Sequence, residues 1–492
     1  MKDNPTAEQQ IIPPWLIFVI TAAALCARVP LLDYSFYGDE GFSLLRDSAQ
    51  LITSTEDRFR PLFFSLLYIW RQLGFTGELG LRLLPLIFGV VQIPLAFLVG
   101  RKLRDDWLGL LLAVLVAASP MLIEFSQELR MYSMVAAIAI AQVYVMLLML
   151  ERFSWWRWSA FVLIAFVGVY THLLYWLFLM GITLTFLRER KQLSIVKSWG
   201  ALAATVLLYL PNLPNLMRFQ ETRSGEYQMD FVSAIPKLLA AFTVGFSYFD
   251  VGEQGAGRAV GTGDLMANLP LALLAIAAGL VIVWKLIWLH LRKEDRGLLW
   301  IGHELFTVPV LIATLASAAT GKYFLQPKYL IFSVPFALLF VAVAFDDLRN
   351  IYGRKMMAVL GSLIAFIAIA HYWEPIEHGR KENWRTAAEV LSTSMNDSTA
   401  FIVLPGHYRL LTYYAPGIEK QWEQIDVQAN AAGAERRLTE LVHSKRDIYY
   451  LRHDVVQNLR DPDDKLITVL NRSGKPLSVT QLNPRFKLYR WG

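Results

Sequence analysis

The chain is poor in cysteine and in charged residues, and both shortages exclude classes of protein. Its 492 residues contain one cysteine, Cys26, so neither a disulfide framework nor a thiolate metal site can form within one chain. The eight histidines show no HExxH or other close ligand pair, which argues against a zinc hydrolase. Only 18% of the residues are charged, and no soluble segment combines basic and aromatic residues as a nucleic-acid surface does, so no nucleic-acid partner is expected.

Long apolar runs are what the chain has instead. Hydrophobic residues make up 55% of the sequence, and the mean hydropathy is +0.39. A run of about 17–25 apolar residues can cross a bilayer as a helix. The sequence therefore predicts a polytopic α-helical membrane protein with about eleven transmembrane helices. The predicted spans are 14–32, 80–100, 107–123, 131–150, 156–170, 174–187, 196–213, 265–289, 298–319, 329–345 and 355–373.

The charged loops predict how these spans are oriented. Lys and Arg near span ends favour the cytoplasmic side, and the basic loops alternate along the chain, which places the N-terminus inside. With an odd span count the tail then lies outside, whereas an even count would return it to the cytoplasm. The chain is expected in the cell membrane, plasma or inner. The basic loops are 101–104, 152–157, 188–191, 292–293 and 349–355, and the outward segments are 33–79, 124–130, 214–264 and the tail.

Four ionisable residues lie between the first two predicted spans. They are the adjacent carboxylates Asp39 and Glu40, and the arginines Arg58 and Arg60. A charged residue at the bilayer centre costs roughly 2.5–3.5 kcal/mol on insertion scales, so ionisable residues close to a bilayer are candidates for function rather than packing. This segment therefore predicts a polar site at the membrane surface.

The same outward segment, 33–79, predicts two helices that lie in the interface. Apolar residues recur at helical spacing after Asp39. A second helix, from 61 to 74, opens with a proline at a helix-start position and reaches only about 21 Å, too short for a core of about 30 Å. Two surface helices would hold the charged residues between them at the membrane rim.

The tail predicts a separate soluble domain. Residues 374–492 are less apolar than the transmembrane domain, 1–373, and their pattern predicts an α/β domain. Acceptor recognition and a stabilising cap on the helical bundle are equally open as its role. The predicted helices are 383–395, 407–415 and 433–444, and the predicted strands are 400–404, 447–451 and several short ones within 466–490.

Several motifs, taken in their order and spacing, resemble the GT-C glycosyltransferases. Within that fold the chain is similar to the dolichyl-phosphate-mannose protein mannosyltransferases and the lipid A aminoarabinose transferases. The likeness is strongest over 14–190 and weaker beyond it. It is carried by Gly38-Asp39-Glu40, Arg60-Pro61-Leu62, Glu78 to Pro85, Ala118-Ser119-Pro120, Phe125 to Tyr132, Tyr170-Thr171-His172, Gln326-Pro327-Lys328-Tyr329 and Asn383 to Ala388.

The resemblance implies an enzyme that takes a sugar from a polyprenyl-phosphate donor and passes it to an acceptor on the outer face of the membrane. Displacement at the anomeric carbon needs a base for the acceptor proton and positive charge for the departing phosphate. It needs no second carboxylic acid, because phosphate leaves well unprotonated. A lipid, a glycan and a protein all stay open as acceptor, and membrane lipids are the other expected partners.

Asp39 is the predicted general base, with Glu40 orienting the acceptor or sharing a bound cation. The alternative for Asp39 is the N-cap of the helix that follows, a common place for Asp before an apolar-periodic run. A divalent cation on either carboxylate is left open, since hard cations take carboxylate oxygens, and no cofactor is assigned.

Basic residues at separate outward turns are the predicted ligands of the donor phosphate. Arg60 leads, because a guanidinium grips phosphate oxygens in bidentate fashion. Leu62 stands where similar proteins often have a second proline. The alternative for Arg58, Arg60, Lys322 and Lys328 is contact with lipid headgroups at the membrane edge. The remaining predicted phosphate ligands are Arg58, Arg130, Lys322 and Lys328.

Polar residues beside those turns are predicted to bind the sugar. Glu128 would hold the sugar or orient Arg130, with a simple ion pair between the two as the alternative, and His172 would bind a sugar hydroxyl or cap a span end. The full set is Gln127, Glu128, Tyr170, His172 and Tyr329. The glycine-rich loop 214–264 is predicted to be a lid over the donor or a plain connector.

Two other functions compete with this one. An oligosaccharide ligase that uses a polyprenyl-pyrophosphate-linked glycan is the nearest alternative. A non-catalytic transporter or flippase predicts ionisable residues inside the spans and broken helices near the bilayer centre, and the predicted spans are almost free of such residues.

Overall fold

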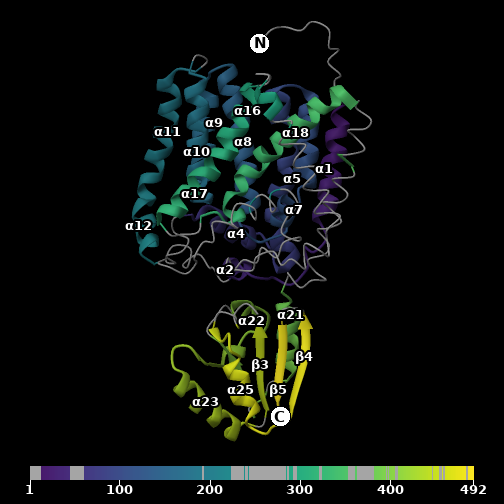
Figure 1. Cartoon of the computed structure of the whole chain (residues 1–492), viewed down its shortest axis with the longest axis vertical. Helices are drawn as coiled ribbons and strands as arrows, with labels where there is room; N and C mark the ends of the chain where they lie inside the picture. The colour runs from purple at the N-terminus through teal and green to yellow at the C-terminus, as the bar shows by residue number, and fades with distance from the viewer. Residues whose placement is uncertain are drawn as a thin grey trace. The chain divides into compact units, whose positions relative to one another are not determined.

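The computed structural model describes residues 13–44, 60–190, 193–222, 296–320, 324–352 and 382–492, the last with short gaps, together with short pieces between 238 and 291 and residues 361–362. The chain divides into two compact units (Figure 1). Unit 1 comprises Met1–Leu32 and Asp47–Tyr372, and unit 2 comprises Asp33–Arg46 and Trp373–Gly492. The segment that carries Asp39 and Glu40 therefore belongs to the unit formed by the tail.

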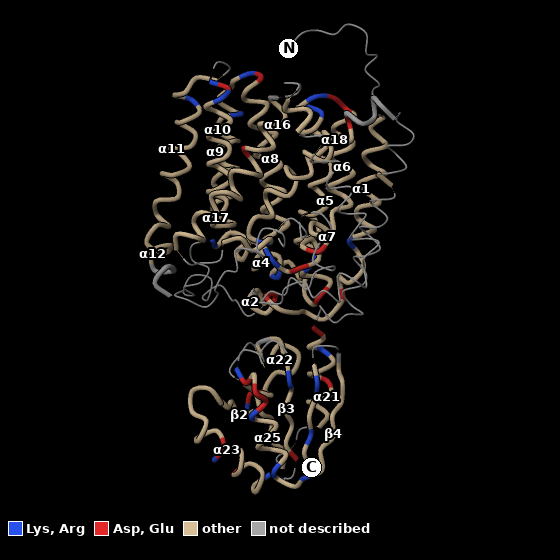
Figure 2. Tube along the Cα trace, viewed as in Figure 1, with Lys and Arg blue, Asp and Glu red and all other residues tan. Residues whose placement is uncertain are grey.

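Unit 1 is a bundle of apolar helices. In Figure 2 its charged residues gather toward the two ends of the helices, and the middle of the bundle is nearly free of them. The described helices are α1 (Pro14–Arg28), α4 (Leu62–Gln72), α5 (Gly77–Leu103), α6 (Asp106–Ala118), α7 (Pro120–Ser126), α8 (Tyr132–Glu151), α9 (Trp155–Thr171), α10 (Tyr175–Arg188), α11 (Ile195–Tyr209), η1 (Leu210–Asn212), α12 (Leu213–Thr222), α16 (Arg296–Gly302), the π-helical turn η2 (His303–Thr307), α17 (Val308–Thr320), the 3₁₀ turn η3 (Pro327–Ser333) and α18 (Val334–Tyr352).

Five stretches among the described residues are long and apolar enough to cross a membrane, and a bent pair of helices makes a sixth candidate. The predicted spans 265–289 and 355–373 fall almost wholly outside the described residues, so the count of eleven stays a prediction. The five stretches are Gly77–Leu103, Tyr132–Glu151, Ile195–Met217, Gly297–Thr320 and Pro327–Asp346.

The predicted span 107–123 is wrong as a single helix. It is two helices, α6 and α7, bent by 59°. Ser119 adopts an extended conformation at the break, its hydroxyl accepts the Leu122 N–H, and Pro120 begins α7. A residue before proline is pushed out of the helical region, and Ser with Pro behind it is a helix start, so the Ser119-Pro120 step ends one helix and begins another.

Helices α5, α7 and α8 are held together by small residues and polar links. A Cβ on Gly89 would lie 2.0 Å from the Ser126 hydroxyl, so α5 and α7 touch. The Ser133 hydroxyl donates to the Pro85 carbonyl at 2.8 Å, and the Gln92 amide donates to the Ser133 carbonyl at 3.0 Å. Small residues and inter-helix hydrogen bonds replace the hydrophobic drive that helices lack in lipid.

Unit 2 is an α/β sandwich around a five-stranded sheet of order β2-β1-β3-β5-β4 (Figure 1). Strand β1 pairs parallel with β2 and β3, whereas β5 pairs antiparallel with β3 and β4. The elements are α2 (Glu40–Leu44), α21 (Trp384–Ser394), β1 (Thr399–Val403), α22 (Arg409–Tyr414), η4 (Ile418–Lys420), β2 (Trp422–Gln424), α23 (Ala431–Ser444), β3 (Asp447–His453), α25 (Lys465–Asn471), β4 (Leu477–Asn483) and β5 (Phe486–Trp491).

Most of these elements agree with the sequence pattern, and one does not. The helix predicted at 383–395 is α21, and the strand predicted at 447–451 is β3. The strands predicted from 466 onward are wrong at their start, because Lys465–Asn471 is the helix α25. The Asp461 carboxylate accepts the first N–H groups of this helix, and apolar side chains one turn apart are buried in the core.

The two helices predicted within 33–79 are partly described. The second is present as the helix α4, which begins after Pro61, and its place in the interface stays a prediction. Of the first, α2 is described and its predicted continuation lies outside the described residues.

Candidate functional site

The acidic residues occupy a tight turn in unit 2. Gly38 has a φ of +48°, a left-handed conformation that glycine adopts without steric cost. The Glu40 N–H donates to the Tyr37 carbonyl at 3.1 Å, and the Phe42 N–H donates to the Asp39 carbonyl at 3.1 Å. Asp39 is half-buried and lies directly before the first residue of α2. This is the position of a helix N-cap, so the capping alternative for Asp39 stays open.

Glu40 is buried and shapes this turn. Its carboxylate Oε2 accepts the Tyr37 N–H at 3.0 Å. This bond closes the turn from Tyr37 to Glu40 a second time, beside the backbone bond between the same two residues. One carboxylate oxygen of Glu40 is therefore engaged in holding the turn that carries Asp39.

The strand of chain before the turn is fixed to α21 and α22. The Phe36 N–H donates to the Tyr414 hydroxyl at 2.8 Å, and the Arg385 N–H donates to the Ser35 hydroxyl at 3.1 Å. The Phe36 ring is fully buried and meets the Tyr413 ring edge-on at 5.5 Å between centroids. These contacts join residues that are far apart in sequence: Ser35 and Arg385 are 350 positions apart, and Phe36 and Tyr414 are 378 apart.

Glu382 ties the turn itself to the tail. Its Oε2 accepts the Gly38 N–H at 3.1 Å and the Trp384 indole N–H at 2.7 Å, and its Oε1 lies 2.7 Å from the His453 Nε2. Burial alone would raise the pKa of Glu382, but His453 and the other two donors together lower this pKa to about 2. Sequence reasoning missed Glu382, although it precedes the Asn383-Trp384-Arg385 motif by one residue.

Unit 1 brings three of the predicted basic and polar residues together. Arg130 and His172 are 5% and 3% exposed, and Arg60 is half-buried at the start of α4. Burial lowers the pKa of His172, in the turn between α9 and α10, and the positive charges of Arg60 and Arg130 lower it further, to about 3. The imidazole is therefore neutral beside two arginines.

Aromatic rings surround this group. The rings of Tyr132, Tyr329 and Phe332 lie 6.1, 6.1 and 6.3 Å from the His172 ring, between centroids. The Arg130 guanidinium lies over the Phe64 ring at 5.8 Å. Among the described residues, the His172 Nδ1 has no hydrogen-bond partner. We call Arg60, Arg130, His172, Tyr132 and Tyr329 the basic cluster.

Glu128 lies beside the basic cluster in sequence and is buried too. Its backbone carbonyl accepts the Arg130 N–H at 2.6 Å, so the two side chains leave the same tight turn. Lys328 is half-buried in η3, next to Tyr329. Arg58 and Lys322 lie outside the described residues.

Two predicted sugar-binding residues make other contacts. The Gln127 amide donates to the carbonyls of Arg28 and Pro30 at the end of α1. The Tyr170 hydroxyl donates to the Leu208 carbonyl at 3.1 Å in α11. Both side chains hold helix ends in place, and for Gln127 only Oε1 is left without a partner among the described residues.

Two fully buried arginines that sequence reasoning passed over organise the end of α1. Arg28 donates to the Ala117 carbonyl at 2.9 Å and to the Val116 carbonyl at 3.2 Å, where α6 breaks. Arg82 donates to the Leu32 carbonyl at 3.0 Å, beside Leu31, which has a φ of +72°. A non-glycine residue in that region costs about 1–2 kcal/mol, so these bonds hold a strained turn just before unit 2 begins.

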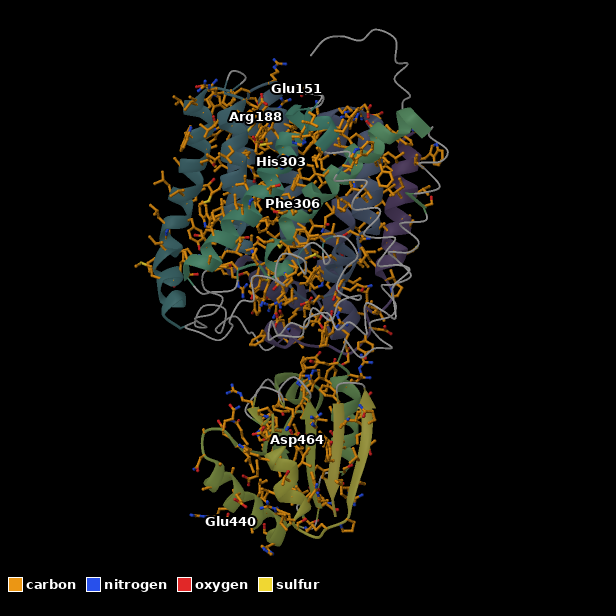
Figure 3. The ribbon with its side chains drawn as sticks, viewed as in Figure 1. Glu151, Arg188, His303, Phe306, Glu440 and Asp464 are labelled. Atoms are coloured by element: carbon orange, nitrogen blue, oxygen red, sulfur yellow. The ribbon has the colours of Figure 1, made fainter. Side chains whose placement is uncertain are left out.

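A second polar network lies at the other end of unit 1. Figure 3 shows Glu151 and Arg188 toward one end of the helical unit, and Figure 1 shows α4 toward the other. The Arg188 Nε donates to the Glu304 Oε1 at 2.9 Å, and the Thr185 hydroxyl donates to the Glu304 Oε2 at 2.6 Å. The loop that begins at Arg188, which is predicted to face the cytoplasm, thus lies at the opposite end of unit 1 from α4, the helix that follows Arg60.

A divalent cation on Asp39 or Glu40 stays a prediction. Among the residues that the structure describes, no three His, Cys, Asp or Glu side chains gather as a metal site would require. Glu40 is turned to the Tyr37 N–H, and Glu382 is occupied by three donors.

Taken together, the helical unit and the α/β unit define the class of the chain, which has the fold of the GT-C glycosyltransferases. The structure of ArnT, the lipid A aminoarabinose transferase, from Cupriavidus metallidurans in the apo state aligns with a TM-score of 0.56 at 14% identity, over 97% of this chain and 98% of that one. The same enzyme bound to undecaprenyl phosphate gives 0.52 at 13% identity, over 97% and 98%.

An oligosaccharyltransferase has the same fold. The enzyme from Archaeoglobus fulgidus, in complex with Zn and sulfate, aligns with a TM-score of 0.52 at 13% identity, over 95% of this chain and 72% of that one. No protein-family model matches the chain, and no curated protein matches it in sequence. At these identities the likeness establishes the fold.

Proposed function

We propose that the chain is an integral membrane glycosyltransferase that moves a sugar from a polyprenyl-phosphate-linked donor to an acceptor hydroxyl on the extracytoplasmic face. The observation that carries this proposal is the basic cluster, in which the half-buried Arg60 and the buried Arg130 lie beside the buried His172. The alignment of an undecaprenyl-phosphate-bound transferase over 97% of the chain supports it.

A lipid phosphate is the ligand that the basic cluster suits. The guanidinium presents paired N–H groups that match two phosphate oxygens. In the proposed site Arg60 and Arg130 bind the donor phosphate, with Arg58, Lys322 and Lys328 as further predicted ligands.

Asp39 is the proposed general base. The acceptor oxygen bonds to the anomeric carbon as its proton passes to the Asp39 carboxylate. The bond from that carbon to the phosphate oxygen breaks on the opposite face, and the electron pair leaves with the polyprenyl phosphate, whose charge the arginines stabilise. Direct displacement inverts the anomeric centre. Asp39 then releases its proton to water.

The sugar is assigned to the polar and aromatic residues around His172. A neutral imidazole can accept a hydrogen bond from a sugar hydroxyl at Nδ1, and the nearby rings of Tyr132 and Tyr329 offer apolar faces. Glu128 remains the proposed partner of another hydroxyl. Gln127 and Tyr170 are also proposed to bind the sugar, in addition to their hydrogen bonds to backbone carbonyls at helix ends.

The cellular arrangement is part of the proposal. Residues 1–373 would form the transmembrane domain and 374–492 an extracytoplasmic domain. The segment 33–46, which carries Asp39, belongs to the same compact unit as the tail. A lipid, a glycan or a protein is the acceptor.

An oligosaccharide ligase is the second candidate, because the oligosaccharyltransferase aligns over 95% of this chain. Purified full-length protein should be offered radiolabelled short-chain polyprenyl-phosphate monosaccharides and polyprenyl-pyrophosphate glycans, with water and a membrane-lipid extract as acceptors. Turnover with one monophosphate donor is expected. Turnover with pyrophosphate donors alone would favour the ligase, and no turnover or saturable binding with either would overturn both.

A further inference from the structure

We propose that Glu382 is a positioning residue for the Asp39 turn, so that the tail of the chain sets the geometry of the base. The anchoring itself is a property of unit 2. Its catalytic consequence rests on the proposed function, because it assumes that Asp39 is the base. The sequence leaves acceptor recognition and a stabilising cap open as the role of the tail. Positioning of the base would be a third role for it.

The contacts converge on one carboxylate. Gly38 and Trp384 donate to one oxygen, and His453 contacts the other. Glu382, Trp384 and His453 are 7%, 2% and 5% exposed. An ionised carboxylate accepts hydrogen bonds without donating any, and charge-assisted bonds are about twice as strong as neutral ones.

The bond to Gly38 is made by the backbone, directly before Asp39. Moving the Gly38 amide therefore moves the Asp39 Cα, one peptide unit away. The other end of the same short segment is fixed by the Phe36 N–H on Tyr414 and by Ser35 on Arg385. The turn is thus held at two points by residues of α21, α22 and the chain before them, and Glu382 is the one next to Asp39.

Anchoring of this kind predicts a specific kinetic signature. Misplacing a catalytic group by about 1 Å can cost about 100-fold in rate, while donor binding by the basic cluster in unit 1 does not use Glu382. Loss of the anchor should therefore lower kcat and leave the donor KM unchanged. A merely structural role would lower the amount of folded enzyme instead.

Tyr450 supplies a matched control. It lies on β3, the same strand as His453, and its buried hydroxyl donates to the Gln457 side chain within unit 2. Tyr450→Phe removes a buried hydrogen bond of the same unit without touching the Asp39 turn. His453→Gln keeps an N–H near the position of Nε2, whereas His453→Ala removes it.

The test is hydrogen–deuterium exchange of the purified full-length protein, read on peptides covering 34–44, with wild type, Glu382→Ala, His453→Ala, His453→Gln and Tyr450→Phe. Glu382→Ala should speed exchange of these peptides about 10-fold or more and lower kcat about 10- to 100-fold. His453→Ala should act in the same direction, His453→Gln should restore most of the protection, and Tyr450→Phe should leave these peptides as in wild type.

Unchanged exchange at 34–44 in both Glu382→Ala and His453→Ala would overturn the proposal, as would an equal increase in Tyr450→Phe. A variant that elutes as aggregate is replaced by the other of the pair, so the comparison survives one misfolded protein. If wild type transfers no sugar from any donor, the proposed function fails, while the exchange result still decides whether Glu382 anchors the turn.

Discussion

The two units use buried charge in opposite ways. In the helical unit, buried arginines such as Arg28 and Arg82 are held by backbone carbonyls at helix ends. In the α/β unit, buried acids such as Glu40 and Glu382 are held by backbone N–H groups. The predicted phosphate ligands lie in the first unit, which also buries the acids Glu128 and Glu304, and the predicted base lies in the second.

The largest expected effect comes from the base. Asp39→Asn keeps the shape of the side chain and removes its ability to take a proton, so kcat should fall about 10²–10⁴-fold with the melting temperature unchanged. Asp33→Asn, on an exposed aspartate of the same segment, is the control and should keep wild-type turnover. If Asp39→Asn lowers stability and leaves turnover per folded molecule intact, Asp39 is a helix cap instead.

The arginines should give the next largest effect, and of a different kind. Arg60→Gln removes a charge-assisted contact worth about 1.5–3 kcal/mol, so kcat/KM for the donor should fall about 10- to 100-fold, with weaker donor binding. Arg101→Gln changes an arginine whose side chain is 57% exposed and should have no effect. Equal kinetics for the two variants would remove Arg60 from the phosphate site.

The structural arginines should affect stability and not chemistry. Arg28→Met leaves buried carbonyls of α6 without their donor, which should lower the free energy of unfolding by about 1–3 kcal/mol. Thermal melting in detergent measures the change, with Arg101→Met as the surface control. Loss of turnover in Arg28→Met at unchanged melting temperature would show that Arg28 does more than hold the helix break.

The smallest expected effect is a pH dependence from Glu382. Its folded-state pKa, about 2, lies below the ordinary value of 4.5, so its ionised form stabilises the fold at pH values above about 4.5. That contribution is lost as the pH falls from 4.5 toward 2. The melting-temperature gap between wild type and Glu382→Gln should therefore narrow over this range, and a gap that stays constant would contradict the pairing.

Local patterns predicted much of the fold. Pro61 and the apolar run after it give α4, and the short apolar run within 447–451 gives β3. The sequence Ser119-Pro120 is a helix-break signal, but the apolar run continues across it and therefore predicted a single span. The helix α25 was missed because Asp461, which caps it, lies four residues before its first residue.

The candidate site was predictable only in part, because sequence patterns report local features. Arg60, Arg130 and His172 were found because each is an ionisable residue at a span end, where charge is expensive. Glu382 was not, because its role depends on Gly38, which is 344 positions away in sequence. The Arg82 bond to the Leu32 carbonyl is likewise long-range. Sequence patterns report local chemistry, whereas these contacts arise from tertiary packing.

The most direct measurement separates binding from transfer. Equilibrium binding of a short-chain polyprenyl phosphate should be compared with single-turnover transfer in wild type, Asp39→Asn and Arg60→Gln. Asp39→Asn is expected to bind as tightly as wild type and to transfer almost nothing, whereas Arg60→Gln should lose binding. The account would be contradicted if Asp39→Asn lost binding while Arg60→Gln kept it, or if wild type bound no polyprenyl phosphate.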